Sequence, residues 1–149
     1  MQLLYTILTA VAIAAPAKKD ETESGTKSVF RSCGSSENFV LHSATFTPDI
    51  MKKGEPVVLT MTATLKMPLD RGITSKNTMK YGFFPVMDDS HDLCDDEGMV
   101  CPVPAGEWTH SKQFVVPGFA LGGKYDGKFE FIDSEGEQVL CLEADMYFN

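Results

Sequence analysis

The sequence predicts an all-β protein, an antiparallel β-sandwich of about seven strands, and three observations indicate this class. From Asn38 onward, apolar and polar residues alternate with a period of two rather than about 3.6. Proline and glycine divide the chain into short segments, as is usual between short strands. No segment has the apolar spacing of an amphipathic helix, so helical crossovers between parallel strands are not expected.

The first segment, residues 1–17, has the composition of a secretory signal peptide. An uncharged apolar run is followed by small residues, and we expect cleavage after Ala17. Residues 18–32 are mostly polar and charged, which is typical of a flexible arm or a removable pro-segment. One folded domain is expected over residues 33–149. A leader of this kind directs the chain into the secretory pathway, either to full secretion or to a vacuolar or lysosomal lumen.

The clearest strand predictions come from two segments with strict alternation. In the segment 57–67 every second residue is apolar and is expected to face the core: Val57, Leu59, Met61, Ala63, Leu65 and Met67. Residues 124–132 alternate in the same way, and residues 133–137 are typical of a hairpin loop. A last strand follows, with an apolar inner face made of Leu140, Leu142, Ala144, Met146 and Phe148. Weaker patterns predict strands over 39–47, 79–86 and 112–116.

Four cysteines lie in the exported part of the chain and allow three disulfide connectivities. Cys94 and Cys101 flank a short acidic loop, which suits a local bridge. Cys33 opens the folded region and Cys141 lies in the last strand, so a bridge between them would tie the two ends together. We therefore predict the pairs Cys33–Cys141 and Cys94–Cys101. In the chain-entropy model, a loop of about a hundred residues stabilises the fold by roughly 4.7 kcal/mol.

No catalytic residues are predicted. The histidines His42, His91 and His110 occur in separate segments, and none belongs to a nucleophile-elbow or metalloprotease motif. We expect them to be exposed polar residues, and we expect neither enzymatic activity nor a cofactor. The formal net charge of −8 argues against nucleic acid as a partner, because nucleic-acid binding needs clustered Lys and Arg.

The acidic run at residues 88–97 is a better candidate for chemistry, because its six carboxylates could hold a hard cation. The run lacks a glycine at the sixth position of a calcium loop, however, and Cys94 interrupts it. A solvated acidic loop is therefore favoured and no metal site is predicted. A calcium-dependent module stays open as an alternative.

Several short motifs follow one another in a recognisable order: Cys33-Gly34, Met79-Lys80-Tyr81-Gly82, Asp92-Leu93-Cys94, Cys101-Pro102, Gly106-Glu107-Trp108, Pro117-Gly118, Gly123-Lys124-Tyr125 and Cys141-Leu142-Glu143-Ala144. Taken together, they resemble the ML domain, the MD-2-related lipid-recognition family. The similarity is to the branch of the fungal phosphatidylglycerol/phosphatidylinositol transfer proteins and their Niemann-Pick C2-like relatives. It extends from Cys33 to about Phe148, although no cysteine occurs over residues 43–50, where many relatives have a further pair.

The resemblance implies an immunoglobulin-like sandwich with an inter-sheet lipid cavity, two disulfides and no catalysis. The implied function is a secreted lipid-binding and transfer protein that carries one phospholipid or sterol and exchanges it with membranes through transient contact. We expect a monomer. The alternative is a secreted interaction module that presents lipid to a receptor or partner protein.

Inward-facing residues of the predicted strands are expected to line the lipid cavity: Leu59, Met61, Leu65, Tyr81, Phe83, Phe114, Val116, Phe129 and Phe131. The mouth is expected between the loop from Cys94 to Cys101 and the loop 117–123. Apolar residues in or beside these loops, where a core role explains them less well, are the predicted portal: Met99, Val100, Val103, Phe119 and Leu121.

Overall fold

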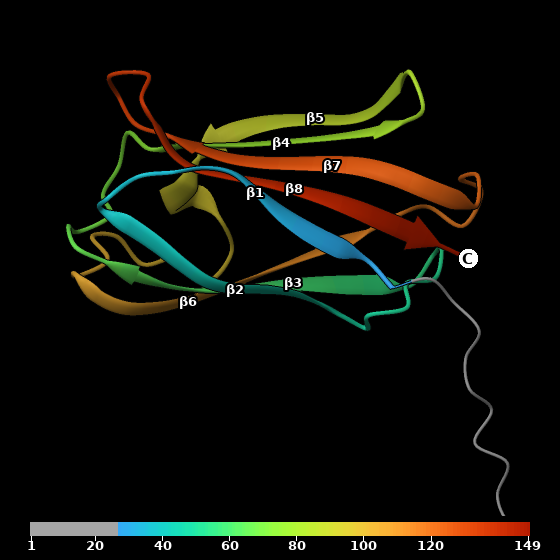
Figure 1. Ribbon diagram of the computed structural model, residues 1–149, viewed down its shortest axis with the longest axis horizontal. Helices are drawn as coiled ribbons and strands as arrows, with labels where there is room; N and C mark the ends of the chain where they lie inside the picture. Colours follow the sequence, from blue (N-terminus) through green and yellow to red (C-terminus); the bar gives the residue numbers. More distant parts are fainter. Residues whose placement is uncertain (1–26) are drawn as a thin grey trace, which may run out of the picture.

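The computed structural model describes residues 27–149 and shows two antiparallel β-sheets packed face to face (Figure 1). The larger sheet has the order β1-β8-β7-β4-β5 and consists of β1 (Val29–Ser35), β8 (Gln138–Phe148), β7 (Gly123–Ile132), β4 (Thr74–Tyr81) and β5 (Phe84–Asp92). The smaller sheet has the order β2-β3-β6 and consists of β2 (Phe39–Thr47), β3 (Pro56–Leu65) and β6 (Gly106–Val115). A short 3-10 helix, η1 (Leu93–Asp95), follows β5. The predicted antiparallel sandwich is confirmed, with eight strands in place of about seven.

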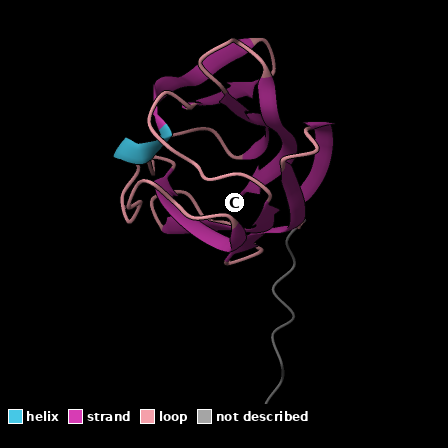
Figure 2. Cartoon of the chain, turned by 90° about the vertical axis from the view of Figure 1, so that its left-hand side faces the viewer, coloured by secondary structure: helices cyan, strands magenta, loops and turns pink. Residues whose placement is uncertain are grey.

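The core lies between the inner faces of the two sheets, and the alternation of apolar residues builds it. Every second residue of β3 and of β8 is buried, as the sequence pattern predicts. The ring of Phe39 meets those of Trp108 and Phe131 edge to face, at centroid distances of 5.6 and 5.8 Å. Figure 2 views the sandwich from the end that carries η1 and shows the curvature of its strands.

The loops gather at the two ends of the sandwich, and the antiparallel pairing decides which loops share an end. One end, called here the acidic end, carries the loops 36–38, 66–73, 93–105 and 133–137. The opposite end, called here the aromatic end, carries the loops 48–55, 82–83 and 116–122. Figure 1 shows η1 at the acidic end, on the left, and the β4–β5 turn at the aromatic end, on the right.

The sequence predicts most strands well, and its errors have local causes. The strand over 39–47 is confirmed with the same bounds, and the strand over 57–67 ends at Leu65, so that Met67 is 56% exposed and not buried. The prediction of one strand over 79–86 is wrong, because Gly82 has a φ of 58° and reverses the chain between β4 and β5. The predicted strand over 112–116 corresponds to the second half of β6, which ends at Val115.

The folded domain begins earlier in the chain than predicted. Val29 to Ser32 belong to β1, where they pair with β8 from Asp145 to Leu142, so the sandwich does not begin at Cys33. The predicted leader and the arm up to residue 26 lie outside the described residues. Within the described part of the chain, no helix has the length and apolar character needed to cross a membrane.

Both predicted disulfides are confirmed. Cys33–Cys141 joins β1 to β8 with a separation of 108 residues, and Cys94–Cys101 closes a loop over a separation of seven residues after β5. The first bridge ties the two ends of the described chain together. The second holds the connection between β5 and β6, which is one of the segments that cross from one sheet to the other.

Candidate functional site

The sandwich has two open sides, where an edge strand of one sheet lies beside an edge strand of the other. On one of these sides the edge strands are β5 and β6, and they are not paired with each other. Each is the last strand of its sheet, with hydrogen bonds to β4 or to β3 on its other side. Three cavities lie along the gap between these two edges, and each has lining residues from both strands. An unpaired edge can move away from its neighbour without breaking ladder hydrogen bonds. This side of the sandwich is therefore the candidate site.

An apolar pocket of about 250 Å³ opens at the aromatic end of the gap. Its walls come from β4, β5, β6, β7 and the loop between β6 and β7: Met79, Val86, Met87, Phe114, Val115, Val116, Pro117, Ala120 and Tyr125. A smaller cavity of about 40 Å³ continues inward and shares Met79, Met87 and Phe114 with the first. We call the two together the apolar channel.

The loop 116–122 covers the mouth of the apolar channel, and two tyrosines fasten it there. The hydroxyl of Tyr81 donates a hydrogen bond to the carbonyl of Gly122 at 3.2 Å, and the hydroxyl of Tyr125 donates one to the carbonyl of Leu121 at 2.6 Å. The two rings lie side by side, with centroids 4.9 Å apart. Burial raises the pKa of Tyr125, so its hydroxyl keeps the proton that it donates.

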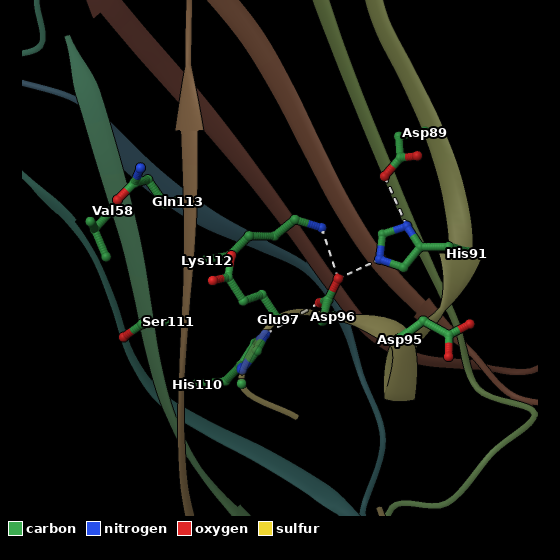
Figure 3. Close-up of a pocket in the computed structure, with 11 residues that line it drawn as sticks. Val58, Asp89, His91, Asp95, Asp96, Glu97, His110, Ser111, Lys112 and Gln113 are labelled. Atoms are coloured by element: carbon green, nitrogen blue, oxygen red, sulfur yellow. Dashed lines mark hydrogen bonds and ion pairs between the residues drawn. The ribbon is translucent and has the colours of Figure 1, made fainter. Parts of the chain in front are cut away.

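A larger cavity of about 780 Å³ lies at the acidic end of the gap and is lined mainly by polar side chains (Figure 3). At its centre Asp96, whose side chain is 6% exposed, accepts hydrogen bonds from His91, from His110 at 3.2 Å and from Lys112 at 3.2 Å. Burial alone would raise the pKa of Asp96. The hydrogen bonds from the two histidines and the charge of Lys112 outweigh burial and hold that pKa well below its usual value.

His91 links two carboxylates, because its Nδ1 lies 2.9 Å from Asp89 and its Nε2 contacts Asp96. Carboxylate oxygens only accept hydrogen bonds, so both contacts are hydrogen bonds at once only when the imidazole carries both protons. His110 stacks on Trp108 with a centroid distance of 5.4 Å. These contacts join β5, the loop after η1 and β6 across the gap, so the cluster ties the two sheet edges together at the acidic end.

The junction between the polar cavity and the apolar channel is formed by Asp89 and Lys112, which line both the large cavity and the small one. The gap thus changes from charged to apolar along its length. Among residues 27–149, no three His, Cys, Asp or Glu side chains are placed to hold a metal ion.

The predicted lining residues divide into three groups. Leu59, Phe114, Val116 and Phe129 line the apolar channel. Met61, Leu65 and Phe131 are buried in the core beside it, and Tyr81 is half-buried at the mouth. The prediction that Phe83 lines the cavity is wrong, because the β4–β5 turn leaves its side chain 98% exposed. A role in lipid binding stays a prediction for all the others.

The predicted portal residues do not surround a single mouth. The loop from Cys94 to Cys101 and the loop 116–122 are separated by β6, whose ten residues span roughly 30 Å at about 3.3 Å each. Met99, Val100 and Val103 therefore lie at the acidic end, and Phe119 and Leu121 lie at the aromatic end. The expected mouth between the two loops is wrong, and only the second loop borders the apolar channel.

Part of the site has no recognisable pattern in the sequence. Met87 and Ala120 line the channel, and His110, expected to be exposed, is 5% exposed in the polar cavity. Met79 and Met87 face each other in the register of β4 and β5, which a hairpin turn at Gly82 would have suggested. The cluster around Asp96 combines three separate segments of the chain, and no spacing of residues in the sequence predicts it.

Together, the fold and the site define an immunoglobulin-like antiparallel sandwich with an apolar channel at one open edge. The family model of the ML domain matches residues 27–148, and the chain therefore belongs to the ML domain family. The predicted family is confirmed.

Three comparisons place the chain among known proteins. A Dictyostelium discoideum protein named putative phosphatidylglycerol/phosphatidylinositol transfer protein 2 is 27% identical over 120 residues, covering 79% of this chain and 84% of that protein. A Niemann-Pick type C2 protein from the Japanese carpenter ant has a TM-score of 0.64 at 18% identity, over 81% of this chain and 99% of that one. Chicken MD-1 in complex with lipid IVa has a TM-score of 0.50 at 12% identity, over 80% of this chain and 96% of that one. The two structures share the fold.

Proposed function

We propose that this protein carries one phospholipid or sterol between its two sheets and exchanges it with membranes, without changing it chemically. The observation that carries this proposal is the apolar channel between the unpaired edges of β5 and β6. The names of the relatives support it, because the Dictyostelium protein is named for phosphatidylglycerol and phosphatidylinositol transfer and chicken MD-1 binds lipid IVa.

The apolar channel suits hydrocarbon, and its open mouth leaves a polar headgroup in contact with water. Burying a methylene group stabilises it by about 0.8 kcal/mol, in a dry channel or in a bilayer alike, so exchange between the two is nearly balanced. The tail would lie against Met79, Met87 and Phe114, and polar headgroup atoms would stay at the mouth of the channel, where water satisfies them.

The channel must widen to accept a lipid. Its main pocket of about 250 Å³ is smaller than the roughly 300–1,000 Å³ of typical small-molecule sites. Separation of β5 from β6 would supply the space, since ladder hydrogen bonds do not join the two strands. The Asp96 cluster at one end and the tyrosine contacts at the other would then set how far the edges part.

Native mass spectrometry of the purified protein, followed by extraction of the bound molecule, tests this function. We expect one intact lipid per chain. Met87→Trp fills the channel from β5 and should abolish lipid binding, whereas the matched variant Ser90→Trp places the same ring on an exposed position of that strand and should retain it. A folded Met87→Trp protein with full lipid content would refute the assignment of the channel.

We also propose that the protein is monomeric and works outside the cytosol, either secreted or in a vacuolar or lysosomal lumen. The two disulfides support such a compartment, because disulfides persist where the environment is oxidising. Size-exclusion chromatography with light scattering checks the monomer, and localisation of a tagged full-length chain checks the compartment.

A further inference from the structure

We propose that the aromatic end of the sandwich is a docking surface for a lipid bilayer, with Phe83 and Phe119 as its main anchors. This inference deepens the proposed carrier function and depends on it for its biological meaning. It rests on three observations: apolar side chains exposed at one end, the charge at the opposite end, and the position of the channel mouth.

The aromatic end exposes an unusual set of large apolar side chains. Phe83 is 98% exposed and Phe119 is 92% exposed, although phenylalanine is among the residue types most often buried. Their neighbours in the two loops and on the adjoining strands are exposed as well: Phe84, Val86, Val115 and Leu121. Exposed apolar groups gathered in this way mark an interaction surface and not a core.

The two loops form one surface, because Tyr81 and Gly122 join them. The hydroxyl of Tyr81, just before the β4–β5 turn, donates a hydrogen bond to the carbonyl of Gly122 in the other loop. No charged residue occurs in residues 81–84 or 116–122. Both loop tips can therefore enter the apolar part of a bilayer without burying a charge.

The charged side chains favour a bilayer as the occupant of this surface. The loops of the acidic end carry two basic residues, Lys66 and Arg71, against eight acidic ones: Glu37, Asp70, Asp95, Asp96, Glu97, Asp133, Glu135 and Glu137. The loops of the aromatic end carry two acidic residues and two basic ones: Asp49, Glu55, Lys52 and Lys53. A negatively charged membrane would repel the acidic end and leave the balanced aromatic end facing the lipid.

The channel mouth lies at the same end as this surface. Val86, Val115, Pro117 and Ala120 line the apolar pocket and come from the same strands and the same loop as the exposed residues. Insertion of the loop tips would bring the pocket to the bilayer surface. A lipid tail could then pass between bilayer and channel along a continuous apolar path.

Flotation with phosphatidylcholine vesicles, and with vesicles of phosphatidylcholine mixed with phosphatidylglycerol, tests the proposal. The double variant Phe83→Ser, Phe119→Ser should partition into vesicles at least about tenfold more weakly than the unchanged protein. The matched control is Met67→Ser, Val100→Ser, which removes two exposed apolar residues at the acidic end and should float like the unchanged protein. Binding should persist at high salt, because apolar contacts are not screened.

The outcomes separate this proposal from the carrier function. Equal loss in both double variants, or no flotation of the unchanged protein, would overturn the docking surface. A dimer that only the Phe83→Ser, Phe119→Ser variant breaks would overturn it too, by showing a second copy as the occupant. Native mass spectrometry on the same samples reports lipid content independently. A variant that keeps its lipid but no longer floats supports docking, whereas an unchanged protein that floats without ever binding lipid refutes the carrier alone.

Discussion

The hydroxyl group of Tyr125 lies 2.6 Å from the carbonyl oxygen of Leu121, and this hydrogen bond fastens the loop over the apolar channel to the base of β7. Tyr125 is buried and itself lines the channel, so one residue forms part of the wall and holds the cover. Together with the contact between Tyr81 and Gly122, this hydrogen bond holds the loop over the mouth of the channel.

Tyr125→Phe should loosen the loop 116–122 while leaving the ring packing intact. Loss of one hydrogen bond costs about 0.5–1.5 kcal/mol, and the effect should be local. Hydrogen exchange should show faster exchange of the loop amides, and release of a bound lipid should be faster. Tyr147→Phe, at a half-buried position on the outer face of β8, is the matched control. Unchanged exchange in the loop of the Tyr125 variant would contradict the role given to this contact.

Asp96 should make the stability of the sandwich depend on pH in the acidic range. Its pKa is lower in the folded protein than the unperturbed value of about 3.9, so its stabilisation is complete above that value and is lost as pH falls toward the folded pKa. Asp96→Asn should lower the melting temperature at pH 7, and the difference from the unchanged protein should shrink below about pH 4. Asp88→Asn, at an exposed position of β5, should show no such difference. A constant gap between Asp96→Asn and the unchanged protein across this range would refute the assignment.

The two disulfides should contribute unequally to stability. In the chain-entropy model, the loop closed by Cys33–Cys141 is worth about 4.7 kcal/mol and that closed by Cys94–Cys101 no more than about 3 kcal/mol, because the second loop is far shorter. Guanidinium unfolding of the two Cys→Ser double variants measures the difference. An equal or reversed order would show that native-state effects outweigh loop entropy.

Phe39 should be among the residues on which folding depends most. It is 1% exposed and contacts both Trp108 and Phe131, so Phe39→Ala should cost about 3–5 kcal/mol. Phe84→Ala makes the same change at an exposed position and should stay within about 0.5 kcal/mol of the unchanged protein. Urea unfolding followed by the fluorescence of Trp108 reports both, and similar losses would contradict the placement of the core.

Much of the fold was predictable because its signals are local. The period of two in β3, β7 and β8 shows directly which side chains face inward, and the predicted buried faces agree with the structure except at Met67. The hairpin of β4 and β5 was missed because the segment 79–86 is apolar on both sides of Gly82. Phe83 and Phe84 have the composition of a core strand and lie on the surface instead.

The site was only partly predictable, and the reason is long-range pairing. Leu59, Phe114, Val116 and Phe129 border the channel because inward facing follows from alternation, and their role in lipid binding stays a prediction. The partners of Asp96 were not identified, since His91, His110 and Lys112 come from two strands that meet only when the sheets stack. The portal was misplaced because loops that follow each other along the chain can lie at opposite ends of a strand.

The sequence by itself determined the all-β class and the buried faces of the main strands and favoured the two disulfide pairs, because periodicity and cysteine position are properties of the chain. Only the tertiary structure decided that β5 and β6 face each other unpaired, that the apolar channel runs between them, and that Phe83 and Phe119 share one exposed end. Which sheet edges meet depends on the packing of residues far apart in sequence, and no local pattern records it.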